Sequence, residues 1–332
     1  MRSLWLLHWR IPIIPENTGY LNRFDFSALR LYNEPSEIGG LFMICTLCPR
    51  QCRADRAVRP GFCGLGEEMR IARIAPHLWE EPPVSGSRGT GAVFFSGCTL
   101  RCVYCQNGGI SHTGDGRVFS PRELSDALKR LTDLGVHTLS FITATPFVPK
   151  ILDTLELWRP PVPVVWNTSG YETVETVRML EGAVDVWLPD LKHFSPRMGQ
   201  LCAKAPDYFT AASAALREMC RQAGPNRYDD DGILTRGVLV RHLILPGLTG
   251  ESMKLLTWVK DNLPSGTPVS LMRQYIPCNG VSVPGLDRRV TEKEYRRVRN
   301  HMLALDLPGF LQEPDSADSG FIPAFNRPDS FV

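Results

Sequence analysis

The sequence has no run of about eighteen uninterrupted apolar residues, which a membrane-spanning helix requires. It also has no block of like charge, because 37 Lys and Arg side chains stand against 35 Asp and Glu side chains, for a net charge of +2. Without a basic block there is no electrostatic footprint for nucleic acid or for an acidic lipid surface. We therefore expect no nucleic acid and no membrane among the partners.

Residues 1–15 resemble a secretory signal only faintly. Arg10 interrupts their apolar run, and no cleavage site of small residues follows. We therefore expect a cytoplasmic protein. Residues 1–42 show no clear periodicity and end at Gly39-Gly40, so we treat them as an N-terminal extension whose order is left open.

The ten cysteines are unevenly distributed along the chain. Two clusters contain most of them: Cys45, Cys48, Cys52 and Cys63 in the first, and Cys98, Cys102 and Cys105 in the second. In a reducing cytosol, clustered cysteines hold metal more often than they form disulfides. The sequence therefore predicts a metalloprotein.

From Gly91 onward, short β-branched apolar runs alternate with helical patterns. The expected strands are residues 92–96, 137–143, 162–166, 183–188, 237–244 and 267–272. The expected helices are 121–134, 147–158, 172–181, 206–223, 250–262 and one that begins after Thr291; Ser120 with Glu123 and Thr291 with Glu294 form capping-box patterns. Repeated strand–helix units require a parallel sheet, either doubly wound or curled into a barrel. Six units fit a partial (β/α)6 barrel of the α/β class.

We divide the chain into three segments on this basis. Residues 1–42 are the extension, residues 43–90 are a four-cysteine module followed by a turn-rich connector, and residues 91–332 are the partial barrel. The connector carries Glu80, Glu81, Pro82 and Pro83 just before the first barrel strand, and we expect it to cover part of the lateral opening of the barrel.

Cys98, Cys102 and Cys105 follow the first barrel strand, at the face where barrel enzymes place their chemistry. Three thiolates at this spacing can each bind one iron of a 4Fe-4S cluster, whereas a closed structural site takes four protein ligands. One iron is then left open for another ligand. A zinc site completed by a distant ligand is the alternative.

Several runs between Cys45 and Phe325 resemble the radical S-adenosylmethionine (radical SAM) superfamily, and in particular an uncharacterised branch similar to pyruvate formate-lyase activating enzyme. They are CTLCPRQC, EEPPVSG, FFSGCTLRCVYCQN, VVWNTSGY, LPDLKHF, APDYFTAA, VRHLILPG, VSLMRQY and FIPAFN. The resemblance implies that Cys98, Cys102 and Cys105 hold the 4Fe-4S cluster and that the open iron binds S-adenosyl-L-methionine. It further implies reductive cleavage to a 5'-deoxyadenosyl radical, with a reductant such as a ferredoxin or flavodoxin.

The resemblance also suggests residues that bind the cofactor. It places Tyr104 near the adenine, with ordinary packing as the alternative. Asn167 and Thr168 follow the third strand, where the superfamily uses polar residues to reach the cofactor or a cation beside its carboxylate. Asp190 and Lys192 follow the fourth strand, and Lys192 is a fitting counter-charge for the cofactor carboxylate; a solvated lysine is the alternative.

Arg241 and His242 interrupt the apolar fifth strand, so their side chains must face a polar space or a partner. They form either a satisfied pair inside the barrel or a contact with cofactor or substrate. We include His242 among the cofactor-binding candidates.

The chain departs from the superfamily after the second strand. Many members carry a Gly-Gly-Glu run there, whose carboxylate and carbonyls hold the methionine ammonium group. This chain has Thr143-Ala144-Thr145 at that position. Backbone carbonyls or the threonine hydroxyls would have to accept those hydrogen bonds.

The first cluster has the spacing Cys45-x2-Cys48-x3-Cys52-x10-Cys63, and its four thiolates would close a metal site without another ligand. Zinc and a second iron-sulfur cluster both accept four sulfur ligands, and the spacing does not distinguish them. Reduced structural cysteines are the alternative to a metal. A role in electron relay is left open.

These observations favour a radical SAM oxidoreductase that removes a hydrogen atom from its substrate. Its resemblance to an activating enzyme suggests a glycyl-radical partner protein, because a barrel of six units leaves a lateral opening through which a polypeptide loop could enter. Radical modification of a small molecule or peptide is one alternative. A non-catalytic iron-sulfur or zinc protein that keeps the barrel as a scaffold is the other.

Overall fold

A computed structural model describes residues 44–278, 280–313, 323 and 325–332. By its contacts the chain divides into residues 1–39 and residues 40–332, and all described residues belong to the second unit. The N-terminal extension of residues 1–42 lies outside the described residues. The boundary between the four-cysteine module and the barrel, at residues 90 and 91, stays a prediction.

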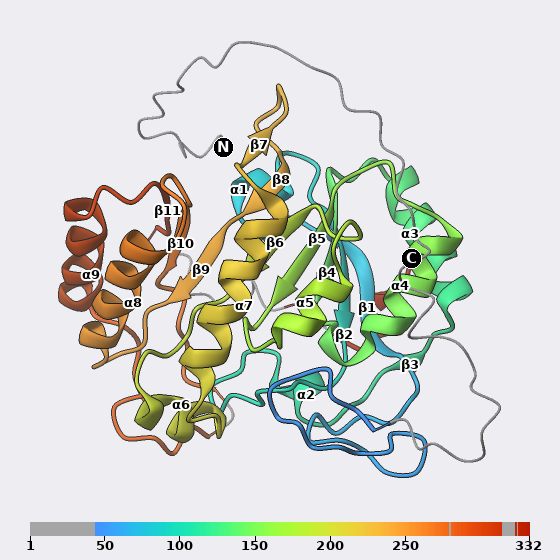
Figure 1. Cartoon of the computed structure of the whole chain (residues 1–332), viewed down its shortest axis with the longest axis horizontal. Helices are drawn as coiled ribbons and strands as arrows, with labels where there is room; N and C mark the ends of the chain where they lie inside the picture. The colour runs from blue at the N-terminus through green and yellow to red at the C-terminus, as the bar shows by residue number, and fades with distance from the viewer. Residues whose placement is uncertain (1–43, 279, 314–322, 324) are drawn as a thin grey trace. The chain divides into compact units, whose positions relative to one another are not determined.

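Parallel strands of two adjoining sheets form the centre of this unit (Figure 1). The first sheet contributes β2 (Thr90–Phe95), β4 (Thr138–Ile142), β5 (Val164–Thr168), β6 (Val186–Pro189) and β8 (Leu234–Val238), and the second contributes β9 (Val240–Leu243) and β10 (Val269–Met272). All six expected strands are confirmed, with β8 and β9 as two halves of the fifth. β8 pairs with β6, β9 pairs with β10, and a parallel bridge from Asp190 to Arg241 connects β6 to β9. The fold is therefore the expected partial (β/α)6 barrel.

Helices follow one another along the outer side of these strands (Figure 1). They are α3 (Pro121–Asp133), α4 (Val148–Leu157), α5 (Val174–Met179), α7 (Tyr208–Ala223), α8 (Thr249–Asn262) and α9 (Glu292–Ala304). Both capping boxes are confirmed, since the Glu123 and Glu294 amides donate to the hydroxyls of Ser120 and Thr291. Among the described residues, no helix is long and apolar enough to cross a membrane.

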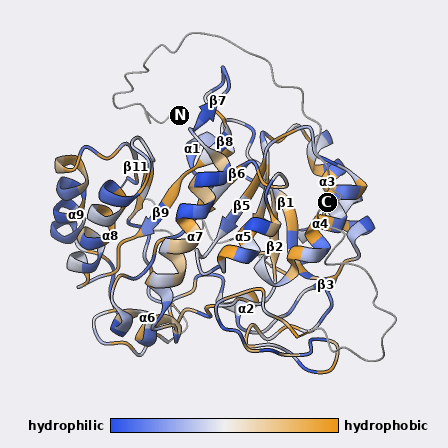
Figure 2. Ribbon diagram, in the orientation of Figure 1, coloured by the Kyte–Doolittle hydropathy of each residue, from blue (hydrophilic) through white to orange (hydrophobic). Residues whose placement is uncertain are grey.

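The core lies between the strands and these helices. Phe141 and Trp166 on neighbouring strands are fully buried and meet edge to face, with ring centroids 6.3 Å apart. Leu124, Leu128 and Leu131 form the buried face of α3. Figure 2 shows the matching pattern, with hydrophobic residues along β1 and β2 and hydrophilic residues on the outward parts of α3 and α9.

The structure also contains elements that the sequence analysis does not predict. They are β1 (Arg70–His77), β3 (Arg117–Val118), β7 (Arg227–Tyr228), β11 (Gly309–Leu311) and α6 (Pro196–Ala203). β1 lies in the expected turn-rich connector and pairs antiparallel with β2, because Ile71 and Ile74 bury their side chains there. Within the described part of the chain, no strand pairing joins β11 to β1, β2 or β3, and Phe325 packs against Phe94 of β2 with ring centroids 5.3 Å apart.

The connector divides between two places: its strand β1 lies along the free edge of β2, whereas the residues after Glu81 enter the barrel, so cover of the lateral opening stays a prediction. The connector forms α1 (Pro82–Ser85), whose fully buried Val84 packs against Val165, Val186 and other side chains of the barrel interior. Thr138, the first residue of β4, donates a hydrogen bond of 3.0 Å to the Val84 carbonyl. Figure 1 shows α1 at the end of the strands opposite to α2 (Gly108–Ser111). The apolar side chain of Val84 therefore draws the connector into the amino-terminal end of the barrel.

Candidate functional site

The loop that carries Cys98, Cys102 and Cys105 leaves β2 at Gly97. This glycine has a φ of 74°, and a Cβ there would lie 2.4 Å from the Leu65 side chain and 2.8 Å from the Cys63 carbonyl oxygen. Only glycine combines this backbone angle with so close an approach. The turn brings the loop onto the carboxyl-terminal end of the parallel strands, as expected for a catalytic loop of a barrel.

The three thiols of this loop lie near one another, because Cys98 and Cys105 both act electrostatically on Cys102. Burial raises the pKa of Cys102 well above its ordinary value and the pKa of Cys105 to about 11. The Leu100 amide donates to the Cys98 sulfur at 3.4 Å, and the Ser111 hydroxyl donates to the Cys105 sulfur at 3.3 Å. Three neighbouring thiols, two of which accept a hydrogen bond, fit a cationic iron centre, which would displace their protons.

Among the described residues, no three histidine, cysteine, aspartate or glutamate side chains are grouped as the ligands of a single metal ion would be. A cubane cluster does not require that grouping, since each thiolate binds a different iron. The donor chemistry of the triad therefore fits a 4Fe-4S cluster better than a zinc ion.

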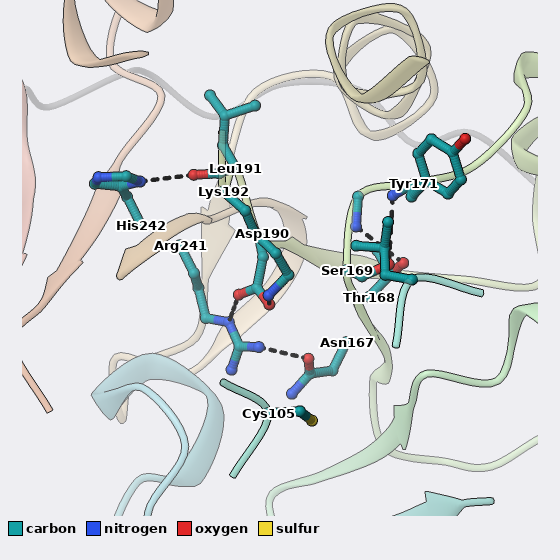
Figure 3. Close-up of polar contacts among 12 residues, drawn as sticks. Cys105, Asn167, Thr168, Ser169, Tyr171, Asp190, Leu191, Lys192, Arg241 and His242 are labelled. Carbon is teal, nitrogen blue, oxygen red and sulfur yellow. Dashed lines mark hydrogen bonds and ion pairs between the residues drawn. The ribbon is translucent and has the colours of Figure 1, made fainter. Parts of the chain in front are cut away.

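A partly buried cluster of charged groups lies at the same end of the strands (Figure 3). Lys192 Nζ lies 2.5 Å from Asp190 Oδ2, and Arg241 Nε lies 2.9 Å from Asp190 Oδ1. Burial alone would raise the pKa of Asp190, but the two cations lower it below its ordinary value. Burial raises the pKa of Cys102 and Cys105, and the charge of Lys192 offsets part of this rise, so its ammonium group lies near the cysteine triad.

Arg241 extends this cluster toward the interior of the barrel. It donates to Asn167 Oδ1 at 2.7 Å and to Glu80 Oε2 at 3.3 Å, and it lies 3.8 Å from Glu81 Oε2. Asn167 Nδ2 donates to Glu80 Oε1 at 2.8 Å, so both ends of the Asn167 amide are bonded. Burial raises the pKa of Glu81 to about 7. The sequence analysis did not assign these two glutamates to the site, although adjacent carboxylates before a buried strand are a usable signal.

Tyr104 lies between two cysteines of the triad and is almost fully buried. Its hydroxyl shares a hydrogen bond of 3.2 Å with His193 Nε2, and its ring packs edge-on against His193 and Tyr275. The Cys278 thiol, from the loop after β10, donates to the Tyr104 carbonyl at 3.3 Å. The environment of Tyr104 is thus aromatic, and a contact with adenine stays a prediction.

Thr168 and His242 do not join the charged cluster. Successive residues of a strand point to opposite faces, so Thr168 faces away from Asn167 and His242 faces away from Arg241. His242 is buried and shares a hydrogen bond of 2.6 Å between Nδ1 and the Leu191 carbonyl (Figure 3). Burial lowers the pKa of His242 to about 4, so the ring is neutral and Nδ1 is the donor. A direct cofactor contact of either residue stays a prediction.

A carboxylate lies beside the position where the superfamily's Gly-Gly-Glu run is absent. Thr145, in the loop after β4, donates to Glu172 Oε1 at 2.8 Å, and Thr168 donates to the same oxygen. Burial raises the pKa of Glu172 to about 7, and its Oε2 has no hydrogen-bond partner in the described region. The Thr145 hydroxyl is therefore already engaged. Thr143, with a φ of 55°, has no side-chain partner among the described residues.

The four-cysteine module packs against this same end of the strands, where Figure 1 shows its loops in blue beside α2. Its four cysteines line one small cavity of about 10 Å³, together with Thr99 and Thr145 of the barrel. Arg50 donates to the carbonyls of Thr99 at 2.8 Å and Ala203 at 2.6 Å. Arg56 donates to the carbonyls of Gly66 and Pro146. The structure thus brings all four predicted ligands to one place.

Comparison with known proteins identifies the family. The model of the family described as "Radical SAM superfamily" matches residues 92–259 of this chain. An uncharacterized protein of Methanocaldococcus jannaschii is 28% identical over 315 residues, which is 90% of this chain and 86% of that protein.

Two solved structures are similar at 14% identity. A radical SAM methyltransferase from Sphaerobacter thermophilus has a TM-score of 0.49, and the match covers 67% of this chain and 66% of that one. A domain of pyruvate-formate lyase-activating enzyme from Bacteroides vulgatus has a TM-score of 0.32, and the match covers 58% of this chain and 91% of that one. The family model covers residues 92–259, which are half of the chain. Members of this family are enzymes that bind a 4Fe-4S cluster and S-adenosylmethionine and catalyse radical reactions. This chain therefore belongs to the radical SAM superfamily.

Proposed function

We propose that this protein uses S-adenosylmethionine to remove a hydrogen atom from a glycine of a partner protein, which would make it an activating enzyme. One observation carries the cofactor half of this proposal. The ammonium group of Lys192 is held 2.5 Å from Asp190 directly after β6, in the cluster that Figure 3 shows together with Cys105 of the triad. A cation beside the cysteine triad is what an amino-acid carboxylate bound to the open iron requires.

When bound, the cluster and S-adenosylmethionine supply a 5'-deoxyadenosyl radical, which takes the hydrogen atom from the substrate. The residues of the chain bind the cofactor and orient it. Lys192 binds the cofactor carboxylate, and Asp190 fixes the ammonium group of Lys192 at 2.5 Å. Arg241 holds the second oxygen of Asp190 and is itself held by Asn167, so the position of Lys192 is set before the cofactor arrives.

In this proposal, the Thr143 hydroxyl accepts a hydrogen bond from the methionine ammonium group. The alternative hydroxyl after β4, that of Thr145, is engaged by Glu172. Thr143 has a left-handed backbone conformation, and its hydroxyl has no partner among the described residues. Tyr104, between Cys102 and Cys105 in the triad loop, lies next to the adenine in this proposal.

Among the described residues no strand pairing closes the sheet between β11 and β1, and this gap supports a polypeptide substrate. Val84 of the connector packs inside the amino-terminal end of the barrel, away from the cysteine triad. A loop of a partner protein can then approach the carboxyl-terminal ends of the strands from the side. The reductant is a one-electron donor protein such as a ferredoxin or flavodoxin.

Cofactor cleavage is the first test. Anaerobically reconstituted and reduced protein should release 5'-deoxyadenosine from S-adenosylmethionine. Lys192→Ala should weaken cofactor binding about 10- to 100-fold, as expected for a lost charge-assisted hydrogen bond, and should leave the iron content unchanged. Lys129→Ala is the matched control, because Lys129 pairs with Asp126 on the surface of α3. No cleavage by fully loaded wild-type protein would indicate a non-catalytic iron-sulfur protein.

The substrate needs a separate test. Reduced enzyme, S-adenosylmethionine and candidate partner proteins should give a glycyl doublet in electron paramagnetic resonance (EPR) spectra. Cofactor cleavage that is stimulated by a small molecule or short peptide, with no protein radical, would replace the activating function by radical modification of that compound.

A further inference from the structure

We propose that Cys45, Cys48, Cys52 and Cys63 hold an iron-sulfur cluster that is in electronic contact with the cysteine triad. The inference rests on the proposed function only in taking the triad as the electron acceptor. Four thiols line the cavity, and neither a histidine nor a carboxylate does. An all-sulfur site of this kind selects iron-sulfur clusters or zinc. The contacts between the module and the triad loop favour the redox-active group.

The triad loop contributes a side chain to the module's cavity. Thr99, which follows Cys98, lines the cavity together with the four cysteines. It is 2% exposed, and its hydroxyl has no hydrogen-bond partner in the part of the chain that the structure describes. A buried hydroxyl without a partner is unfavourable by itself. A cluster sulfide or thiolate in the cavity would accept its hydrogen bond, and such bonds set the reduction potential of a cluster.

The backbones of the two cysteine sets also touch. A Cβ at Gly97 would lie 2.8 Å from the carbonyl oxygen of Cys63, so Gly97 and Cys63 are in direct contact. Gly97 precedes Cys98, and consecutive Cα atoms are about 3.8 Å apart. The route from a ligand of one set to a ligand of the other is therefore one backbone contact and one residue.

A second glycine, Gly61, leaves space for the iron-sulfur cluster of the module. A Cβ at Gly61 would lie 3.3 Å from the Cys52 sulfur and 3.5 Å from the Cys63 sulfur. Gly61 has no positive φ that would demand glycine. Its missing side chain is explained by the two sulfurs, which a methyl group would crowd.

Both cysteine sets share a hydrogen-bonding pattern. The amide two residues after the cysteine donates to the sulfur at Cys48, Cys63 and Cys105. The Leu100 amide makes the same contact with Cys98. Amide donors at this offset stabilise thiolates bound to metal. The module is thus built in the same way as the loop that holds the catalytic cluster.

The proposed step moves one electron and changes no covalent bond. A ferredoxin or flavodoxin is oxidised by one electron and reduces the cluster of the module. That cluster then returns to its oxidised state as it reduces the cluster of the triad. Zinc has no redox chemistry and could not take part.

Metal content is the first test. The variant Cys98→Ala/Cys102→Ala/Cys105→Ala, reconstituted anaerobically, should retain about four irons per chain, as a cubane contains. It should also show an EPR signal after reduction. Stoichiometric zinc, or no metal in this variant, would overturn the proposal.

Magnetic interaction tests the contact between the two centres without S-adenosylmethionine, so its outcome is independent of the proposed function. The EPR spectrum of fully reduced wild-type protein should show splitting or accelerated relaxation that the triad-deficient variant lacks. A wild-type spectrum that equals the sum of two isolated clusters would contradict the contact.

Thr99 provides a test that a merely structural role would not pass. Thr99→Val should keep the iron content and lower the reduction potential of the module's cluster, because a hydrogen bond to sulfur is lost. Thr99→Ser should restore the wild-type potential. Equal potentials in all three proteins would assign Thr99 to packing alone.

Gly61→Ala tests the cavity itself, with Gly250→Ala as a control because a Cβ at Gly250 meets no atom within 4 Å. Gly61→Ala should weaken metal binding by the module about 10- to 100-fold, in the range of altered ligand surroundings. Equal metal content and equal resistance to a chelator in both variants would contradict the assigned cavity.

Discussion

The triad loop and the four-cysteine module lie at the same end of the strands, yet the chain holds them differently. The triad loop continues from β2, is turned by Gly97 and returns through α2. Regular structure in residues 44–69 consists of a single bridge between Ile44 and Asp55. The side chains of Arg50 and Arg56 hold the module in place instead, because they donate to barrel carbonyls of Thr99, Ala203 and Pro146.

This difference shows where the stability of the site comes from. In the barrel, the sheet buries the charged cluster of Asp190, Lys192 and Arg241 and fixes it in the absence of any metal. In the module, burial raises the pKa of the Cys48 and Cys63 thiols, which therefore keep their protons until a metal displaces them. The barrel is therefore stabilised by its own packing and charged contacts, whereas the stability of the module depends on its metal.

Removing the metal should produce the largest effect and should separate the two regions. In metal-free protein, amides of residues 44–66 should exchange rapidly while those of β2, β4 and β5 stay protected. We expect the metal to add about 5 kcal/mol or more to local protection, since structural metals in small thiolate modules supply about 10–16 kcal/mol. Hydrogen exchange measured by mass spectrometry checks this. If amides of the barrel strands lost as much protection as those of the module, the two regions would not differ in their dependence on metal.

Breaking the buried charges should affect the barrel. Arg241→Ala leaves Glu80, Glu81 and Asp190 without their shared cation and should lower the free energy of unfolding by about 3–5 kcal/mol. Urea denaturation of the reconstituted protein measures this. Arg296→Ala is the control, because Arg296 is exposed and lies 3.9 Å from Glu292, so its loss should be below about 1 kcal/mol. Equal losses in the two variants would contradict a stabilising role for the cluster.

The sequence predicts what is encoded locally. The capping boxes at Ser120 and Thr291 are read from residues three apart, and the triad from residues within one loop. The buried strands follow from their β-branched apolar runs. Even α6 carries a local signal, because Ser195 and Pro196 form an N-cap followed by proline.

The connections that build the site are not local. Arg241 meets Glu80 across 161 positions, and Arg50 meets Ala203 across 153. No periodicity relates such residues, since only the closing of the barrel brings them together. Glu172 is a second example, because its isolated position in the sequence gives no sign of the hydroxyls that surround it.

Glu172 should give a pH-dependent effect of intermediate size. Burial raises its pKa from 4.5 to about 7, so the folded chain holds a proton that the unfolded chain releases. Wild-type stability contributed by this group is complete below pH 4.5 and is lost as the pH rises to about 7. Glu172→Gln should remove about 2–3 kcal/mol of this pH dependence, on the scale of 1.36 kcal/mol per pKa unit. Unfolding free energies at pH 4.5, 6 and 7.5 measure it. Glu175→Gln, which removes an exposed charge on α5, is the control and should retain the wild-type slope.

Arg50 should have the smallest effect, and that effect should depend on the metal. Arg50→Ala removes hydrogen bonds to Thr99 and Ala203, each of which water can replace in part, and the packing of its guanidinium on the Phe62 ring at 3.9 Å. We expect a loss of about 1–2 kcal/mol in module protection, measured by hydrogen exchange.

The loss should be visible in metal-free protein, where Arg50 is a main attachment of the module, and smaller after reconstitution, where the metal also orders its loops. Arg59→Ala, which removes an exposed arginine of the same module, should change neither state. Equal losses with and without metal would mean that the arginine contacts and the metal stabilise the module independently. The module would then be docked on the barrel before it binds its metal, and the contrast between the two regions would be one of degree.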